Sequence, residues 1–573
     1  MSNLTNRTIC LIMSALLLTA LCTVAAGKII YVDDDATGTN DGSGWENAYV
    51  YLQDAMADAN SVEESVEIRV AQGIYIPDQG AIQTLGDREA TFRLINGVTL
   101  KGGYAGLGET DPNARDFELF ETILSGDLNG DDVQDDDVEI VDHEYLAGQP
   151  TRAENSYNVV TGSGTNNSAV LDGFTITAGN ANGKEGPDDD QWRFKYGAGM
   201  FNISGSPTLA NCTFTMNSSL AGAGMFNESA NPTIVNCTFI RNGGRGMGNW
   251  HSSPTLTNCT FTSNSDSGMF NWDSSLTLTN CTFSENRSLY GGGICNKPPN
   301  TLKLTDCSFI RNSADIAGGG MDGGTATLTS CVFIGNKALQ GGGIQSGSST
   351  LINCAFIANK ATDWGGKIWS GSDNMLHCIF SGNSAGICGG AIYMFNSDLL
   401  LTNCTLTGNW APNGNALASD KFFDAPSNVE LKNCIVWGGG SEIWNDDGSS
   451  ITISYSDIHG GQVGIYDPYS VLVWGEGNID TDPLFADPGY WVDANDPNNA
   501  LWINGDYHLK SEAGRWDPVS ENWVIDDVTS PCIDAGDPLT PVMYEPHPRG
   551  CFINMGAYGG TEEASKSPFN PPY

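Results

Sequence analysis

The sequence predicts an all-β protein, a right-handed parallel β-helix (solenoid) with an N-terminal helical cap and an irregular C-terminal cap. Three features predict this fold: a row of regularly spaced cysteines, an asparagine five residues after most of them, and a glycine-rich turn in most repeats. Successive cysteines of this row lie 25, 22, 22, 26, 24, 23, 24, 26 and 30 residues apart. Such a period is typical of solenoids, in which each repeat buries its apolar face only against its neighbours. The ladder cysteines are Cys212, Cys237, Cys259, Cys281, Cys307, Cys331, Cys354, Cys378, Cys404 and Cys434.

Residues 1–26 are predicted to be a secretory signal peptide. Arg7 supplies a short positive region, residues 9–21 an apolar core, and residues 24–26 a small-residue cleavage site. No later run is long and apolar enough to span a bilayer. We therefore expect a secreted or extracellular protein, or one held at the cell surface or outer membrane, with no membrane span.

Residues 27–165 are expected to form the N-terminal cap and the first, irregular rungs of the β-helix. Residues 29–33 are strand-like, and residues 66–70 alternate between apolar and polar side chains as strands do. Residues 51–59 carry apolar side chains at helical spacing. We expect this helix to cap the solenoid, whose end otherwise exposes an apolar cross-section and unpaired strand edges.

An acidic segment of this region is the best candidate for a metal site. Asp127, Asn129, Asp131 and Asp135 supply oxygen ligands at positions 1, 3, 5 and 9, which suits Ca²⁺. The segment resembles the calcium loop of dockerin modules and EF-hands, but it lacks the turn glycine and the carboxylate at position 12. It predicts either a Ca²⁺ site, the one cofactor we consider, or a solvated acidic loop.

Residues 166–475 are expected to form the regular repeats. Cysteine and phenylalanine alternate at two-residue spacing, as in Cys212 and Phe214, so both face one side of a strand. Glycine permits the left-handed backbone of the turns, and stacked asparagine amides can bond to the rungs above and below. Repeats of 22 to 30 residues leave no room for crossover helices, and parallel crossovers are right-handed. The asparagines are Asn217, Asn242, Asn264, Asn286, Asn312, Asn336, Asn359, Asn383 and Asn409.

The cysteines admit three interpretations: disulfides, a metal site, or buried free thiols. Equivalent Cβ atoms on neighbouring rungs are expected ~4.8 Å apart, which is wide for a disulfide. No Cys-x-x-Cys motif or histidine cluster accompanies them, as a metal site would require. We therefore predict a row of thiols that fills the core.

Residues 476–573 lack the repeat period and are rich in Asp, Pro and aromatic residues. We expect them to form the C-terminal cap from irregular short strands. Cys532 and Cys551 lie 19 residues apart there. They are the best candidates for a disulfide, with two free thiols as the alternative.

Several motifs resemble known families. The Phe-x-x-Asn signatures with Gly-Gly-Ala-Ile (389–392) resemble the repeats of chlamydial polymorphic outer-membrane proteins. Residues 29–49 and 66–77 resemble the start of secreted planctomycete-type β-helix proteins, and motifs such as NIDTDPLF (478–485) and SPCIDAGD (530–537) resemble the choice-of-anchor Q module. These resemblances imply a secreted or surface location and no particular reaction.

Charge and aromatic residues bear on the partner. With 68 acidic and 26 basic residues the chain carries a formal charge of −42, which excludes nucleic acids and anionic membrane surfaces. Trp250 and Trp272 are one coil apart, so their indoles could stack ~4.8 Å apart on one face, and Trp364 and Trp369 could extend the row. The row predicts either a polysaccharide-binding platform or aromatic packing for stability.

No catalytic residues are predicted. The Gly-His-Gly and Arg-x-Lys signatures of polygalacturonase-like hydrolases are absent, and the six histidines are scattered. His377 takes the position before a ladder cysteine and is expected to be structural. We expect an adhesin-like or glycan-binding structural protein, with a polysaccharide lyase or glycoside hydrolase of the pectin-lyase-like type as the alternative. The oligomeric state is not set by the sequence.

Overall fold

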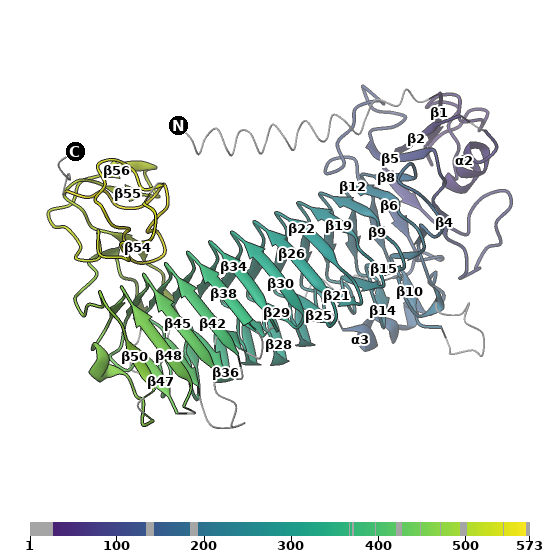
Figure 1. The fold of residues 1–573 in the computed structure, drawn as a ribbon. Coiled ribbons are helices and arrows are strands. Elements are labelled where there is room, and N and C mark those ends of the chain that lie inside the picture. The colour runs from purple at the N-terminus through teal and green to yellow at the C-terminus, as the bar shows by residue number, and fades with distance from the viewer. Residues whose placement is uncertain are drawn as a thin grey trace.

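The computed structural model describes residues 27–62, 64–132, 142–183, 193–345, 347–365, 367–368, 372–395, 397–419, 427–446, 448–469, 471–492, 501–542 and 544–568. These residues form an elongated parallel β-solenoid, with strands of successive coils lying side by side (Figure 1). The predicted all-β solenoid is confirmed. The signal segment 1–26, Asp135, Trp369 and residues 184–192 lie outside the described residues.

Three long parallel sheets run the length of the solenoid, and we call them sheets A, B and C. Sheet A contains β1 (Lys28–Val32), β2 (Val66–Ala71), β5 (Val98–Tyr104), β8 (Val170–Asp172), β12 (Thr208–Ala210), β16 (Thr233–Val235), β19 (Thr255–Thr257), β22 (Leu276–Thr279), β26 (Thr301–Thr305), β30 (Thr325–Thr329), β34 (Ser349–Ile352), β38 (Ser372–Leu376), β42 (Asp398–Thr402), β45 (Asn428–Lys432), β48 (Ser450–Ser454) and β50 (Leu472–Trp474). Sheet B contains β3 (Gly73–Tyr75), β6 (Thr122–Ser125), β9 (Thr175–Thr177), β13 (Thr213–Thr215), β17 (Thr238–Ile240), β20 (Thr260–Thr262), β23 (Thr282–Ser284), β27 (Ser308–Ile310), β31 (Val332–Ile334), β35 (Ala355–Ile357), β39 (Ile379–Ser381), β43 (Thr405–Thr407), β46 (Ile435–Trp437) and β49 (Asp457–Ile458). Sheet C contains β4 (Phe92–Arg93), β7 (Val160–Thr161), β11 (Met200–Ile203), β15 (Met225–Glu228), β18 (Met247–Trp250), β21 (Met269–Trp272), β25 (Ile294–Lys297), β29 (Met321–Asp322), β33 (Ile344–Gln345), β37 (Lys367–Ile368), β41 (Ile392–Met394), β44 (Leu417–Ser419) and β47 (Ile443–Asn445).

Smaller elements flank these sheets. A five-stranded parallel sheet contains β24 (Arg287–Tyr290), β28 (Ser313–Ala317), β32 (Lys337–Gln340), β36 (Lys360–Trp364) and β40 (Ser384–Ala385). The pairs are β10 (Asn180–Ala181) with β14 (Ser218–Ser219), β51 (Phe485–Asp487) with β54 (Asp506–Leu509), β52 (Tyr490–Val492) with β53 (Leu501–Ile503), and β55 (Arg515–Asp517) with β56 (Asn522–Val524). The helices are α2 (Leu52–Ala59), α3 (His143–Ala147), and the 3₁₀ turns Pro150–Arg152 and Gln462–Gly464. No helix among the described residues has the length and hydropathy needed to cross a bilayer.

The core is built from stacked rows of identical side chains. The ten ladder cysteines are buried and free, and the phenylalanines two residues after them stack from Phe214 to Phe380. Neighbouring rings lie 4.5–5.0 Å apart and are nearly parallel. Because each coil repeats the same register, each side chain meets its equivalent on the next coil.

The buried asparagines form a hydrogen-bonded ladder beside the phenylalanine stack. The Asn264 side-chain amide, for example, donates to the carbonyl of Phe239 and to Oδ1 of Asn286, both at 2.9 Å. The backbone N–H of Asn264 donates to the same Oδ1 at 3.0 Å. The ladder therefore satisfies backbone groups at a turn that no strand pairing serves.

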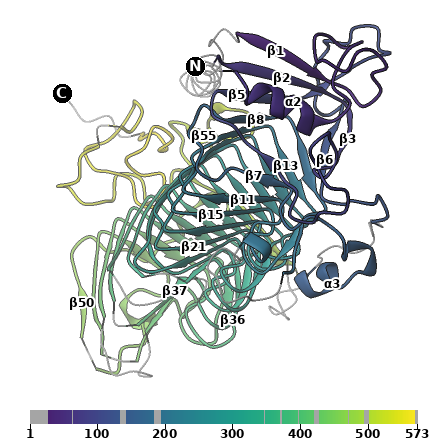
Figure 2. The same ribbon diagram turned by 90° about the vertical axis from the view of Figure 1, so that its right-hand side faces the viewer.

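The two ends of the chain are arranged differently. Helix α2 lies against β1 and β2 at the N-terminal end, with Leu52, Ala55 and Met56 buried (Figure 2). The described part of the tail, residues 476–568, which we call the tail module, lies beside the last coils and contacts the outer face of sheet B (Figure 1). Leu472 and Trp474 of the last strand of sheet A pack against the core yet stay only partly buried, so the module covers the side of the stack rather than its end.

Candidate functional site

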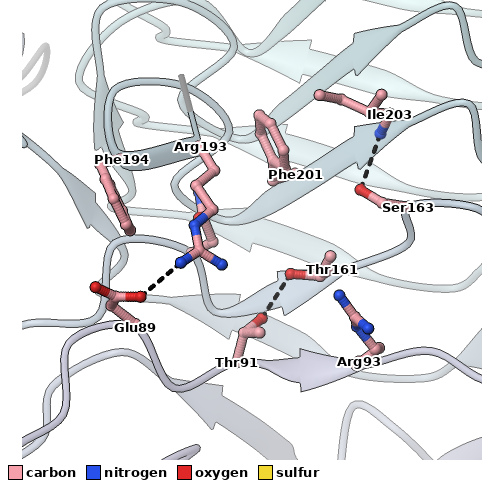
Figure 3. A pocket seen from close by; sticks show the side chains of 10 residues that line it. Glu89, Thr91, Arg93, Thr161, Ser163, Arg193, Phe194, Phe201 and Ile203 are labelled. Atoms are coloured by element: carbon pink, nitrogen blue, oxygen red, sulfur yellow. Dashed lines mark hydrogen bonds and ion pairs between the residues drawn. The ribbon is translucent and has the colours of Figure 1, made fainter. Parts of the chain in front are cut away.

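A cleft of about 430 Å³ opens on the outer face of sheet C, near the N-terminal end of the solenoid (Figure 3). Strands β4, β7 and β11 form its floor, and residues 193–194 form one wall. We call it the sheet C cleft. It is lined by Glu89, Thr91, Arg93, Asn158, Thr161, Ser163, Arg193, Phe194, Phe201 and Ile203.

Strand alternation explains why these side chains face outward. Phe92, Val160 and Met200 are paired across the three strands and are buried in the core. Their neighbours Arg93, Thr161 and Phe201 are paired at the next position, and they line the cleft. Successive residues of a strand point to opposite faces, so burial of the first row places the second row in the cleft.

Most polar groups of the cleft already have partners. Thr91 Oγ1 and Thr161 Oγ1 lie 2.9 Å apart, and Ser163 Oγ accepts a bond from the backbone N–H of Ile203 at 3.0 Å. Arg193 forms an ion pair with Glu89 at 2.5 Å. The Glu89 charge is therefore compensated within the cleft.

Arg93 is the exception. Among the arginines that the structure describes, Arg93 alone donates to no acceptor and pairs with no carboxylate. Its side chain is exposed and points into the cleft (Figure 3). The lining carries two arginines and one glutamate, a net positive charge in a chain of formal charge −42.

An aromatic row continues from the cleft along sheet C. Phe201 stacks on Phe226 with ring centroids 6.0 Å apart, and Phe226 contacts Trp250 at 5.4 Å. Trp250 is paired in register with Trp272, with centroids 5.7 Å apart. Trp272 is 52% exposed.

The predicted flat stack of Trp250 and Trp272 needs correction. The two indole planes are tilted by 55°, and Trp250 packs edge-on against Phe226. Aromatic rings favour such tilted and edge-to-face contacts over a face-to-face sandwich. Trp364 belongs to a separate cluster on later coils, where it stacks with Tyr393 at 6.1 Å.

The predicted calcium loop is only partly described. One carboxylate oxygen each of Asp127, Asp131 and Asp132 lie within 4.8 Å of one another. Asp127 accepts backbone N–H bonds from Gly130, Asp131 and Asp132, while Asn129 Oδ1 accepts one from Asp131. Asp132 pairs with Arg152 at 3.2 Å, so one carboxylate is neutralised without a metal. Ca²⁺ binding stays a prediction.

The most perturbed carboxyl groups of the described residues lie away from the cleft, one where the coils meet the tail module and one inside that module. Burial raises the pKa of Asp457 to about 6 and that of Glu545 to about 7. Asp457 accepts a bond from the Cys532 thiol at 3.0 Å, and Glu545 accepts backbone N–H bonds from Asn554 and Gly560. These groups are 0% and 4% exposed, so neither faces a ligand: Asp457 joins the coils to the module, and Glu545 holds the module together from inside.

The disulfide considered between Cys532 and Cys551 is not formed. Both thiols are free, and Cys532 is buried while Cys551 is exposed. The buried thiol instead donates to Asp457, which fixes it on the coil side of the interface.

The sequence did not point to the cleft residues Arg93, Thr161, Ser163 or Phe201. The alternation in Phe92-Arg93-Leu94 is a usable signal that Arg93 faces outward. The signal is short, and nothing in the sequence shows that Thr161 and Phe201 lie beside it.

Comparison with known proteins agrees with the architecture. Residues 151–276 and 251–385 match the protein family described as "Right handed beta helix region", and residues 475–536 match the one described as "Disaggregatase related". Residues 151–385 thus form a right-handed β-helix repeat region, and the predicted handedness is confirmed. No curated protein matches the chain.

Three solved structures are similar to this chain at low identity. Pectate lyase Pel9A is 13% identical over 93% of this chain and 97% of its own, with a TM-score of 0.33. The A-module of the Azotobacter vinelandii mannuronan C-5 epimerase AlgE4 is 12% identical (78% and 100% covered, TM-score 0.32). The catalytic unit of the GH87 α-1,3-glucanase from Streptomyces thermodiastaticus is 11% identical (80% and 71% covered, TM-score 0.32). Similarity at this level assigns no reaction to this chain.

Proposed function

We propose that this protein binds glycans in a structural or adhesin-like role, after secretion or at the cell surface, and that the sugar occupies the sheet C cleft. The observation that carries the proposal is the composition of the cleft. Aromatic rings, hydroxyl groups and an unpaired arginine converge on about 430 Å³ of space. Sites for small ligands are typically of this size, mostly apolar, with a few placed polar groups.

The chemistry of the lining suits a sugar ring. Phe194 is partly exposed and offers aromatic surface to the apolar face of the ring, while Phe201 forms the buried floor beneath it. Thr161 and Ser163 offer hydroxyl groups that can both donate and accept. The aromatic row toward Trp272 gives a longer glycan a second contact on the same face of the solenoid. A polysaccharide lying along the axis of the solenoid would therefore contact both the sheet C cleft and Trp272.

Retention on immobilised polysaccharides tests the proposal. We expect the Trp272→Ala variant to be retained about tenfold more weakly, which corresponds to the loss of roughly 1.4 kcal/mol. Tyr490→Ala is the matched control, because Tyr490 is 59% exposed and lies in the tail module. Equal retention of Trp272→Ala and wild type, with circular dichroism unchanged, would contradict a role for the aromatic row. No retention of the wild type on any polysaccharide would overturn the proposal itself.

The same incubation addresses the enzymatic alternative. A lyase would release unsaturated uronates that absorb in the ultraviolet, and a hydrolase would release reducing ends. Hydrolysis usually needs two carboxyl groups at a defined separation, whereas Glu89 is the one carboxylate that lines the described cleft. We therefore expect retention without products.

A further inference from the structure

Among the described residues, the sheet C cleft contains a cation without a counter-charge. In a chain with 68 acidic and 26 basic residues, a cation without an acidic neighbour is unusual. Arg93 is nevertheless unpaired, and the one carboxylate in the lining, Glu89, is held by Arg193. Arg88, next to Glu89 in sequence, is fixed over the Tyr157 ring and bonded to the carbonyl of Asn155. The described lining of the cleft therefore carries a net positive charge.

From this arrangement we propose that the cleft takes an anionic sugar unit, bearing a carboxylate or a sulfate, and that Arg93 binds its charged group. The inference rests on the proposed function and names the substrate class of that site. The guanidinium fork donates two parallel hydrogen bonds to a carboxylate or sulfate, a geometry that lysine cannot reproduce.

The register of the strands gives the anionic unit a defined position. Arg93, Thr161 and Phe201 lie at one level across three adjacent strands. Adjacent strands are spaced ~4.8 Å apart, so Arg93 and Phe201 are separated by roughly 10 Å at the backbone. A sugar whose acidic group meets Arg93 would therefore lie over Thr161 with its ring directed toward Phe201.

The large negative charge of the chain does not forbid an anionic ligand. Exposed charges are largely screened beyond ~8 Å at physiological ionic strength, so groups inside the cleft dominate once the sugar is bound. The distant carboxylates reduce binding chiefly at low salt, where screening is weak. Binding should therefore be measured near 0.15 M ionic strength.

Matched pairs of polysaccharides test the inference on the full chain. The first pair is polygalacturonate and its fully methyl-esterified form, and the second is a sulfated galactan and its desulfated form. We expect the wild type to prefer the charged member of one pair by about tenfold or more, since hydrogen bonds to charged groups contribute about 1.5–3 kcal/mol. The pair that shows the preference identifies carboxylate or sulfate as the ligand group.

Three variants locate that preference. Arg93→Gln should abolish it, and Arg93→Lys should restore part of it because the charge remains without the fork. Lys303→Gln removes an equal charge from an exposed position on sheet A and should change nothing. Glu89→Gln frees Arg193 from its ion pair and should strengthen binding of the charged member.

The outcomes separate the inference from the function on which it rests. Equal binding of charged and neutral members by the wild type would overturn the anionic assignment and leave glycan binding intact. An equal loss in Arg93→Gln and Lys303→Gln would also overturn it, because the effect would then be unspecific charge. Absence of binding to all four polysaccharides would instead overturn the proposed function.

Discussion

Single side chains stabilise this solenoid because each is repeated on every coil. Asn264 is fully buried, and its amide joins the coils on either side. A buried amide without partners destabilises the fold, so asparagine is stable there only because the next coil presents another asparagine. The same logic places free thiols and phenylalanines in uninterrupted rows.

Loss of one side-chain amide of the asparagine ladder should therefore destabilise the fold. In Asn264→Ala, the carbonyl of Phe239 and the backbone N–H of Asn242 lose buried hydrogen-bond partners. We expect the free energy of unfolding to fall by roughly 3 kcal/mol, because each unsatisfied buried group costs about 1–3 kcal/mol. Urea denaturation measures this change. Thr255→Ala, at an exposed position of sheet A, is the control. Equal urea midpoints for the two variants would contradict a stabilising role of the ladder.

The state of the cysteines gives a second prediction at this scale. Of the fourteen described cysteines, all are free and Cys551 alone is exposed. A thiol reagent should label one cysteine in the native protein and the remaining described ones only after denaturation. The Cys551→Ser variant should show no rapid labelling. Rapid labelling of several thiols would contradict the buried row.

At the scale of elements, one turn position explains how the tail module docks. The fourth residue after most ladder cysteines has a positive φ, as in Arg241, Ser263 and Glu285, although such residues rarely adopt it. Glycine takes this position at Gly382 and Gly408, where a Cβ would lie 2.0 Å from the indole of Trp502. Glycine is thus required there by the close approach of Trp502 as well as by the turn.

Alanine substitutions at this position should separate the two effects. Gly335 has the same backbone conformation, but its Cβ would meet only Arg311 at 3.7 Å. We expect Gly335→Ala to lower the free energy of unfolding by about 1 kcal/mol, through backbone strain alone. Gly408→Ala should cost more and should release the tail module, detected as faster proteolysis of residues 476–568. Equal effects of the two substitutions would contradict docking through Trp502.

At the scale of the whole molecule, the tail module and its interface with the coils contain carboxyl groups that prefer to be neutral. Burial raises the pKa of Asp457 from 3.8 to about 6 and that of Glu545 from 4.5 to about 7. A raised folded-state pKa contributes stability that is fully present below the unfolded value and is lost as pH rises through the folded value. The folded, docked tail module should therefore be most stable near pH 4 and should be less stable toward pH 7.

The pH dependence can be assigned to these two carboxyl groups. We expect the free energy of unfolding of the tail module to fall between about pH 4 and pH 7, by roughly 3 kcal/mol for each group. Urea denaturation followed by tryptophan fluorescence measures it. The double variant Asp457→Asn, Glu545→Gln should show a much flatter profile, because neither side chain then ionises. Wild type and variant with parallel profiles would contradict the assignment.

The sequence alone determined the architecture of this protein. The spacing of the ladder cysteines, with the phenylalanine and asparagine that follow each one, contains the register of the coils. Repetition makes such a prediction secure, because one local pattern satisfies the same packing and hydrogen bonds on every coil. The helix predicted at 51–59 was also correct, since α2 spans Leu52–Ala59.

The tertiary structure alone decided where a ligand could lie and where the tail goes. Arg93, Thr161 and Phe201 come from irregular coils of unequal length, so no period predicts that they meet at one level. The tilt of Trp250, the free thiol of Cys532 and the position of Trp502 over Gly408 likewise depend on contacts between segments distant in sequence. Local periodicity sets the coil, whereas the outer surface is set by how irregular segments pack onto it.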